Sequence, residues 1–388
     1  MTLTKIQHII LHLVKYIYFT SKMGCSSSSE ADQSVTPPPV VDTAPAVVVP
    51  PPPPLNKTKS EYVNLSDLED AMNSSGAAED MNIMLFIDFT ASNNATGKYS
   101  FGKANLHSLR GGTNHYLDTI EAMRKLVKTD QDGNVAVYTY GSGAANKFKG
   151  CVEYHGSFSS VDDVKEWYLE HSQKESVKND MAGPTTLKYV TDEGQRVTNV
   201  TGRFQTMIVI TDGDPTDMYK KTDIAEVFDA SQNPMSIVVI GVGDGVYNKS
   251  DDMPEFPFYE ALDKISKDDL NDVAKLCMIE DTMGVDRGTI AHAAARMGEP
   301  KYDNFQFVNL ERDVLRGSEM TDEMQEKLYL KAFGETPRHY EEVKKRTVLN
   351  YKPNYSQAFV HPPPPDWVDP NASKADGISP AEVAVNIA

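Results

Sequence analysis

The stretch NIMLFIDFTAS, residues 82–92, joins an apolar run to a segment rich in carboxylate and hydroxyl side chains. Five consecutive apolar residues that end at Asp88 are typical of a strand buried on both faces of a sheet. The polar residues Asp88, Thr90 and Ser92 would then follow the point where this strand leaves the sheet. The stretch therefore predicts both the first strand of the fold and the first part of a candidate site.

Four more apolar runs follow along the chain, and helical patterns lie between and after them. The runs are residues 135–140, 207–211, 235–242 and 305–308, and the helical patterns are residues 116–128, 161–171, 187–198, 223–230, 259–277, 320–333 and 338–345. Strands that alternate with helices predict an α/β fold, in which helices flank a doubly wound and mostly parallel sheet. Ligands of such sheets bind beyond the carboxyl ends of the strands, so the residues just after each run are the candidate ligands.

Oxygen-bearing side chains occupy three such places. Asp88, Thr90 and Ser92 follow the first strand, Thr185 follows a Gly-Pro turn, and Asp212 follows the third apolar run. Hard oxygen ligands of this kind suit Mg²⁺ or Mn²⁺, with water in the remaining positions, and Ca²⁺ is the less favoured ion. We therefore predict a metal site formed by these five residues.

The order Asp88-x-Thr90-x-Ser92, then Thr185, then Asp212 resembles the metal-ion-dependent adhesion site of von Willebrand factor A domains. The flanking sequences resemble the copine group of these domains at residues 105–107, 114–116, 183–185, 233–237 and 303–308. The resemblance covers residues 80–345 and implies a copine-like von Willebrand A domain there.

This resemblance also implies a role for each candidate ligand. Ser92 would contact the metal directly, Thr90 would offer its hydroxyl, and Thr185 would ligate when the site is open to a ligand. Asp88 and Asp212 would supply negative charge, directly or through water. A carboxylate from a protein partner would complete the coordination of the ion.

Enzymatic alternatives lack residues that their chemistry requires. A phosphatase of the haloacid-dehalogenase type needs a second acid two residues after the first, where this chain has Thr90. The sequence contains no P-loop motif, and its three cysteines cannot form the RING domain that a plant group of ubiquitin ligases joins to a copine-like domain. The scattered histidines, His107 among them, are expected to pack or to lie at the surface. We therefore expect a protein that is not an enzyme and has no ligase activity of its own.

Two other classes of function stay open. One is a metal-dependent phosphoryl-transfer enzyme that uses the same ion, for which Asp214 and Asp217 are the near candidates for a general acid or base. The other is a metal-independent scaffold protein in which the site is vestigial.

The amino-terminal residues carry a lipidation pattern. Residues 1–22 are an uncertain leader or upstream extension, since their apolar run is interrupted by His12 and Lys15. If translation starts at Met23, Gly24 matches the myristoylation pattern and Cys25 is placed for palmitoylation. Two acyl chains would hold the protein at the cytoplasmic face of a membrane, with the plasma membrane preferred, whereas the unacylated protein would be cytoplasmic.

Charge and proline content bound the possible partners. The chain has 56 acidic and 38 basic residues, a net charge of −18, which excludes a general nucleic-acid binder and disfavours lipid docking by charge alone. We predict that residues 23–79 are an acylation motif with a proline-rich disordered linker and that residues 346–388 are a disordered tail. Their proline runs could bind SH3 or WW domains. The predicted function is a membrane-anchored, copine-like adaptor for a protein partner.

Overall fold

The computed structural model describes residues 62–99, 101–102, 105–109, 114–126, 135–147, 151–248, 253–264 and 302–345. The predicted acylation residues Gly24 and Cys25 and both proline-rich segments lie outside these residues. Within the described ranges, no helix is long and apolar enough to cross a membrane.

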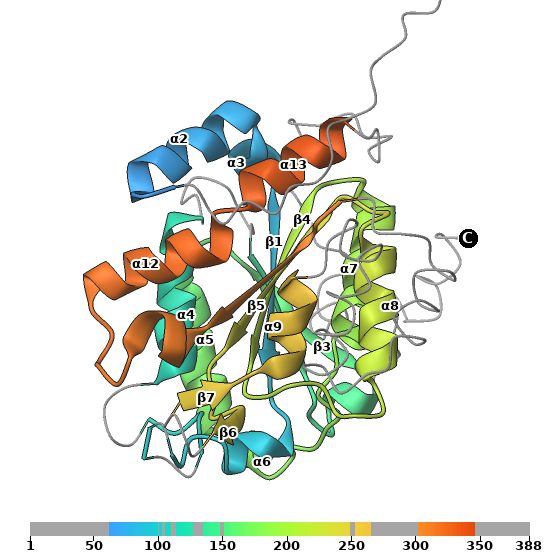
Figure 1. Cartoon of the computed structure of the whole chain (residues 1–388). Coiled ribbons are helices and arrows are strands. Elements are labelled where there is room, and N and C mark those ends of the chain that lie inside the picture. The colour runs from blue at the N-terminus through green and yellow to red at the C-terminus, as the bar shows by residue number, and fades with distance from the viewer. Residues whose placement is uncertain are drawn as a thin grey trace, which may run out of the picture. The chain divides into compact units, whose positions relative to one another are not determined.

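The fold is built on a six-stranded sheet with the strand order β3-β2-β1-β4-β5-β8 (Figure 1). All neighbouring strands run parallel except the edge strand β3, which is antiparallel to β2. The strands are β1 (Asn82–Asp88), β2 (Val135–Tyr140), β3 (Val152–Phe158), β4 (Gln205–Thr211), β5 (Met235–Gly241) and β8 (Phe305–Asn309). The predicted doubly wound, mostly parallel α/β sheet is confirmed, and all five apolar runs form strands. The order places β1 and β4, which precede predicted ligands, side by side in the middle of the sheet.

Helices flank the sheet at the predicted places, with ends shifted by a few residues. The described α-helices are α2 (Leu65–Ser75), α3 (Ala77–Asp80), α4 (His115–Ala122), α5 (Val161–Gln173), α6 (Glu175–Lys178), α7 (Lys188–Thr201), α8 (Lys220–Ala230), α9 (Pro257–Lys264), α12 (Asp322–Phe333) and α13 (Thr336–Lys345). The helix predicted at 259–277 is described as far as Lys264, and its remainder lies outside the described residues. A small hairpin of β6 (Val246–Asn248) and β7 (Met253–Glu255) precedes α9.

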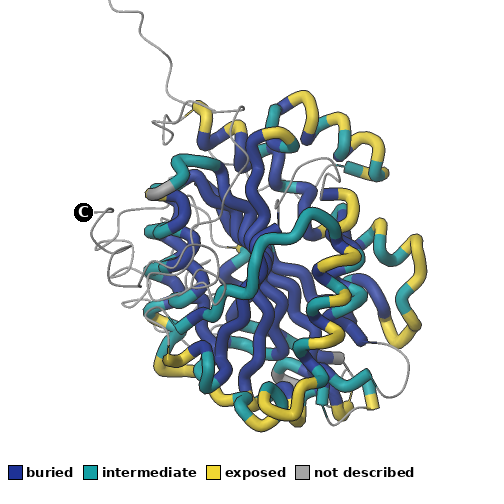
Figure 2. Tube along the Cα trace, turned by 180° about the vertical axis from the view of Figure 1, so that it is seen from behind, coloured by how far each residue is buried: buried dark blue, intermediate teal, exposed yellow. Residues whose placement is uncertain are grey.

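Alternate residues of β1 point into two separate cores. Ile83, Leu85 and Ile87 pack with buried side chains of α4, α5 and α12 on one face of the sheet. Met84 and Phe86 pack with buried side chains of α7, α8 and α9 on the other face (Figure 1). Figure 2 shows the resulting pattern, in which the central strands are buried along their whole length. Burial on both faces explains why these strand sequences are apolar throughout instead of alternating with polar residues.

The predicted linker ends too late, because residues 65–80 form α2 and α3. Leu68 and Met72 lie one turn apart on α2 and are buried in the domain core. Lys344 of α13 donates a hydrogen bond to the Ser75 carbonyl at 3.0 Å, and Tyr340 of α13 donates one to Asp80. Leu65, Leu68 and Met72 do have helical spacing, but they stand in a short polar stretch next to the proline-rich segment, and the sequence analysis assigned them to the linker. Contacts with the distant α13 stabilise the helix.

The sequence analysis also misses β3. Only its first residue, Val152, is fully buried, and the following side chains are partly exposed. An edge strand of this kind lacks the continuous apolar run by which the central strands are predicted.

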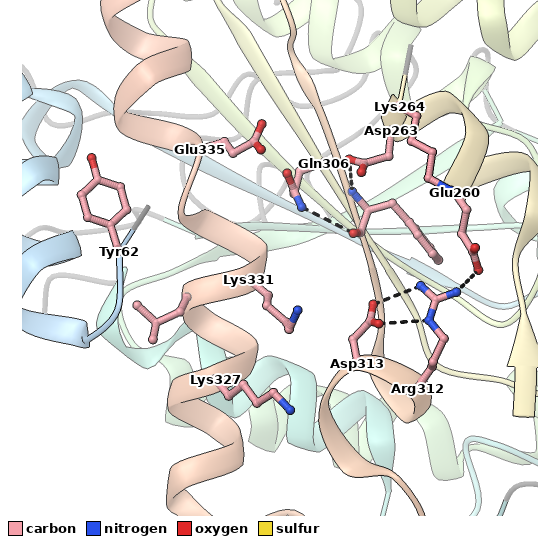
Figure 3. A pocket seen from close by; sticks show the side chains of 12 residues that line it. Tyr62, Glu260, Asp263, Lys264, Gln306, Arg312, Asp313, Lys327, Lys331 and Glu335 are labelled. Atoms are coloured by element: carbon pink, nitrogen blue, oxygen red, sulfur yellow. Dashed lines mark hydrogen bonds and ion pairs between the residues drawn. The ribbon is translucent and has the colours of Figure 1, made fainter. Parts of the chain in front are cut away.

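Carboxylate side chains occupy the open edge of the sheet at β8. Asp263 accepts a hydrogen bond from the Phe307 N–H at 3.0 Å (Figure 3). Asp313 accepts one from the Asn309 N–H at 3.0 Å. Arg312 holds Asp313 in place, with 3.0 Å between its Nε and Oδ1. Unpaired strand edges are templates for another chain, so these carboxylates protect the protein from self-association.

Replacing Asp263 and Asp313 together by Ala should expose the two N–H groups and increase self-association. Sedimentation velocity should then detect more dimers or larger species than the wild-type protein forms at the same concentration. The matched control replaces the exposed Glu170 and Glu319, which removes the same charge away from the edge. Equal self-association of the edge variant and the control would contradict this role.

Candidate metal centre

Four of the five predicted ligands come together at the carboxyl ends of β1 and β4. Asp88 is the last residue of β1, and Asp212 directly follows β4. Ser92, in a short 3₁₀ turn after β1, donates to Asp212 with 3.0 Å between Oγ and Oδ1. The hydroxyl oxygens of Thr90 and Ser92 are 2.8 Å apart, and Thr90 Oγ1 is 3.4 Å from the same Asp212 oxygen. The structure thus forms a cluster of two carboxylates and two hydroxyls.

The fifth residue, Thr185, lies on a neighbouring loop. The Ala91 N–H donates to the Ala182 carbonyl at 2.8 Å, which joins this loop to the segment between Thr90 and Ser92. The Thr185 carbonyl accepts from the Thr216 N–H at 3.0 Å, which joins the same loop to the segment after β4. Among the described hydrogen bonds, none connects the Thr185 side chain to the other four residues. Its loop is in place, but its hydroxyl is not part of the cluster.

Both carboxylates of the cluster are completely buried. Asp88 accepts hydrogen bonds from the Thr90 N–H at 2.7 Å, the Thr211 hydroxyl at 2.8 Å and the Tyr140 hydroxyl at 3.1 Å. Burial nevertheless raises the pKa of Asp88 above its ordinary range. Burial, together with repulsion from Asp88, raises the pKa of Asp212 to about 8. Two buried carboxylates that disfavour each other's charge create a place where a cation would be stabilising.

The donor set is one of oxygens, as expected for a hard divalent cation. Within the described residues, no group of three or more His, Cys, Asp or Glu side chains is arranged to hold a metal ion. A site here would therefore rely on hydroxyl oxygens and water beside Asp88 and Asp212. The hydroxyl of Ser92 fits such a role, because its hydrogen points to Asp212 while its lone pairs stay available.

Sequence analysis missed Thr96 and Asp223, two residues that hold the site. Thr96 donates to Asp212 Oδ2 at 2.6 Å. Asp223, buried in α8, accepts from the Thr186 hydroxyl at 2.6 Å and from the backbone N–H groups of Leu187 and Lys188 at 2.9 and 3.1 Å. It thereby fixes the start of α7 directly after Thr185. The polar run at 90–96 hints at Thr96, whereas nothing in the sequence links Asp223 to a loop 38 residues earlier.

Residues of the copine-like stretches 105–107 and 114–116 form a buried support beneath Asp88. His107 Nε2 lies 3.0 Å from the Asp88 carbonyl oxygen, which can only accept, so Nε2 carries the proton. The other ring nitrogen, Nδ1, then accepts from the Tyr168 hydroxyl at 2.8 Å. Tyr116 bonds Asn93 at 2.7 Å. Burial lowers the pKa of His107 to about 3, so it stays neutral and acts as a packing residue, as the sequence analysis expects of the histidines.

Close backbone packing fixes the position of Thr90. Gly141, in the loop after β2, has a φ of 79°, and a Cβ placed on it would lie 2.3 Å from the Thr90 methyl group. Only glycine therefore fits at this place.

The phosphoryl-transfer alternative names Asp214 and Asp217 as candidates for a general acid or base. In the structure, both side chains bind elements other than the cluster. Asp214 accepts from the N–H groups of Phe258 and Tyr259 at 3.0 and 3.4 Å, and so caps α9. Burial raises its pKa to about 6. Asp217 is exposed and pairs with Lys220 at 3.0 Å. None of the described hydrogen bonds joins either residue to the cluster.

Comparison with known families agrees with the motifs. Residues 105–266 match the family model described as Copine. The domain is copine-like. This finding confirms the resemblance on which the assignment of the candidate ligands rests, although the match itself begins after Asp88, Thr90 and Ser92.

Curated relatives fall into two groups. The E3 ubiquitin-protein ligase RGLG2 of Arabidopsis thaliana is 25% identical over 80% of this chain and 59% of its own length. RGLG4 of the same plant, also named an E3 ubiquitin-protein ligase, is 26% identical over 84% of this chain and 76% of its own length. Copine family protein 1 of Caenorhabditis elegans is 28% identical over 47% of this chain and 16% of its own length. The chain thus spans about three fifths of RGLG2 and far less of the worm protein.

These relatives correct one expectation. The prediction of a protein that is not an enzyme is contradicted, because proteins that match most of this copine-like chain are named E3 ubiquitin-protein ligases. The argument from missing catalytic motifs fails because a partner-binding domain can belong to an enzyme without carrying its catalytic residues.

Solved structures with a related fold share little sequence with this chain. The manganese-loaded TRAP protein of Plasmodium vivax aligns with 60% of this chain and 69% of its own, at 16% identity and a TM-score of 0.29. A von Willebrand factor type A protein from Catenulispora acidiphila aligns with 57% of this chain and 42% of its own, at 15% identity and a TM-score of 0.26. No property of their sites carries over at this level of similarity.

Replacing Gly141 by Ala should displace Thr90 and destabilise the domain by about 2 kcal/mol or more, because the new methyl group overlaps the Thr90 side chain. Gly102→Ala is the matched control, since Gly102 also has a positive φ, 62°, but a Cβ added there would have no atom within 4 Å. Urea unfolding of both variants measures the difference. An equal loss of stability in both variants would mean that the positive φ alone, and not contact with Thr90, accounts for the need for glycine at position 141.

Asp212 should make the metal-free protein less stable as the pH rises. Its pKa is about 8 in the folded protein and has an ordinary value of 3.8, so the folded state holds a proton that the unfolded state releases. This contribution is fully present below pH 4 and is lost as the pH rises to 8. Urea unfolding in a chelator at pH 5, 6, 7 and 8 should give a steeper decline for the wild type than for Asp212→Asn. Parallel declines would contradict the assignment.

Proposed function

We propose that the copine-like domain binds a protein partner through a divalent cation, Mg²⁺ or Mn²⁺ in preference to Ca²⁺, and a carboxylate of that partner. The observation that carries the proposal is the burial of Asp88 and Asp212 side by side with the hydroxyls of Thr90 and Ser92. Such a cluster offers two carboxylates whose ionised form a cation would stabilise, together with hydroxyl oxygens that can bind the ion, which is the chemistry that a hard cation requires.

Each residue would have a distinct task. Ser92 and Thr90 would present hydroxyl oxygens to the ion, and Thr185 would add a third hydroxyl from its loop. Asp212 and Asp88 would balance the positive charge, with Tyr140 and Thr211 holding Asp88 in its orientation. The cation, when bound, supplies electrostatic attraction for an outside carboxylate. Because only two protein carboxylates of the described cluster face it, the ion keeps enough positive charge to bind a third.

We also propose how this domain would contribute to ubiquitin ligation. Relatives named E3 ubiquitin-protein ligases support a role in which the copine-like domain captures the protein that is to be modified. If translation starts at Met23, acylation of Gly24 and Cys25 would place this capture at the cytoplasmic face of a membrane. The proline-rich segments would offer further contacts to SH3 or WW domains.

Removal of one hydroxyl ligand should weaken Mn²⁺ binding by about tenfold or more, because the ion loses an oxygen that water replaces poorly in a buried site. Isothermal titration of Mn²⁺ into wild type, Ser92→Ala and Thr185→Ala measures this loss directly. Ser74→Ala, on α2 at the opposite end of β1 from the ligands, is the control (Figure 1). Unchanged Mn²⁺ affinity in both ligand variants would show that the ion binds elsewhere.

The same variants test whether a protein partner binds through the metal ion. Proteins captured from lysate on wild type in Mg²⁺ should be lost in a chelator and on Thr185→Ala, and kept on Ser74→Ala. Capture that persists in the chelator and on Thr185→Ala would contradict binding through the ion and favour the metal-independent scaffold.

A further inference from the structure

A cavity of about 560 Å³ lies against the edge strand β3, and none of Asp88, Thr90, Ser92, Thr185 and Asp212 lines it. Its walls come from β3, from α5 and α6, and from the loops that follow β2 and α6. A volume of this size holds a side chain or a small ligand. The residues used below are Phe89, Lys147, Glu153, His155, Trp167, His171, Lys174 and Asp180, all of which line it.

Aromatic rings form one wall of this cavity. Trp167 and His171 stack with 4.9 Å between ring centroids, and His171 meets His155 and Phe89 edge-on at 4.6 and 5.4 Å. Burial lowers the pKa of His171 to about 4 and that of His155 well below its ordinary value. The wall is therefore uncharged at neutral pH and presents flat ring surfaces beside polar ring atoms.

The cavity also contains a carboxylate that lacks a charged partner among the residues the structure describes. The Glu153 side chain is 27% exposed, and its nearest ionisable contact is the neutral His155 at 3.9 Å. Burial and the nearby Asp180 raise the pKa of Glu153, and Lys147 partly offsets them. Asp180 accepts from the Ala144 N–H at 2.5 Å, and Lys174 pairs with Glu170 at 3.0 Å. In the described part of the chain, no cation lies within ion-pair distance of Glu153.

The cavity is lined by residues that neighbour the candidate metal centre along the chain. Phe89 follows Asp88 directly and contributes to the aromatic wall. The loop that carries Asp180 continues to Ala182, which accepts from the Ala91 N–H at 2.8 Å. A partner segment bound at the metal centre would therefore extend within a few residues to this cavity.

We propose that the cavity binds a guanidinium group, the side chain of an arginine close in sequence to the metal-bound carboxylate of the partner. This inference rests on the proposed function for its physiological ligand, but the cavity itself needs no metal. A guanidinium is planar and weakly hydrated, so it packs on aromatic rings and donates in a fork to a carboxylate. Glu153 would receive the fork and Trp167 the flat face. The partner would thus be recognised by a carboxylate and an arginine together.

The test uses the full chain and acetyl-arginine N-methylamide as the probe, which carries a guanidinium and no carboxylate. The chain has two tryptophans, so Trp367→Phe leaves Trp167 as the only tryptophan, which is excited selectively over the tyrosines at the red edge of their absorption. Titration should change Trp167 fluorescence equally in Mg²⁺ and in a chelator. The neutral isostere acetyl-citrulline N-methylamide should bind at least about tenfold more weakly, because it lacks the charge.

Two charge variants sharpen the result. Glu153→Gln should weaken binding of the arginine probe by about tenfold, whereas Lys147→Gln should strengthen it by removing a competing positive charge. Glu166→Gln, exposed on α5 outside the cavity lining, is the matched control and should bind as the wild type does. Circular dichroism checks that each variant is folded. Equal binding of the arginine and citrulline probes, or unchanged binding in Glu153→Gln, would overturn the proposal.

The two proposals fail in different ways. Loss of Mn²⁺ binding in Ser92→Ala with normal binding of the arginine probe would support both sites as independent. If the arginine probe bound only in the presence of Mg²⁺, the proposal that the cavity binds a guanidinium without a metal would be overturned.

Discussion

The burial of two carboxylates at the ends of neighbouring strands is the constraint on which this site depends. Asp88 ends β1 and Asp212 follows β4, and the parallel pairing of these strands forces the two acids together. Neither acid is exposed to water, which would otherwise screen its charge. The surrounding residues reduce the resulting repulsion with hydroxyl and N–H donors, namely Thr90, Ser92, Thr96, Tyr140 and Thr211. A cation removes more of this repulsion than any neutral donor can.

Much of this arrangement follows from local sequence. An apolar run that ends in an acid predicts a buried strand with a polar end, and the same pattern at β1 and β4 predicts that their ends converge. Asp88, Thr90, Ser92 and Asp212 are found together for this reason. The loop of Thr185 is also in place, whereas the orientation of its hydroxyl depends on contacts that no motif encodes.

The parts that sequence reasoning missed depend on residues far apart in the chain. α2 is stabilised by contacts with α13, more than 260 residues later, and its apolar residues lie in a short polar stretch beside a proline-rich segment. Asp223 reaches the start of α7 from a separate helix, and β3 is only half-buried at the sheet edge. Patterns in a short window cannot detect such contacts. The ligase names of the relatives could not be anticipated for a related reason, since the sequence motifs of one domain carry no record of the catalytic domains that relatives join to it.

The end helices of the domain lie on the side opposite the candidate centre. α2, α3 and α13 sit together where β1 begins, whereas Asp88 stands where β1 finishes (Figure 1). Chain that continues from either end of the described domain therefore leaves from the face that points away from the cluster. A lipid or a folded module attached at either end would therefore leave the cluster uncovered, on the face opposite its point of attachment.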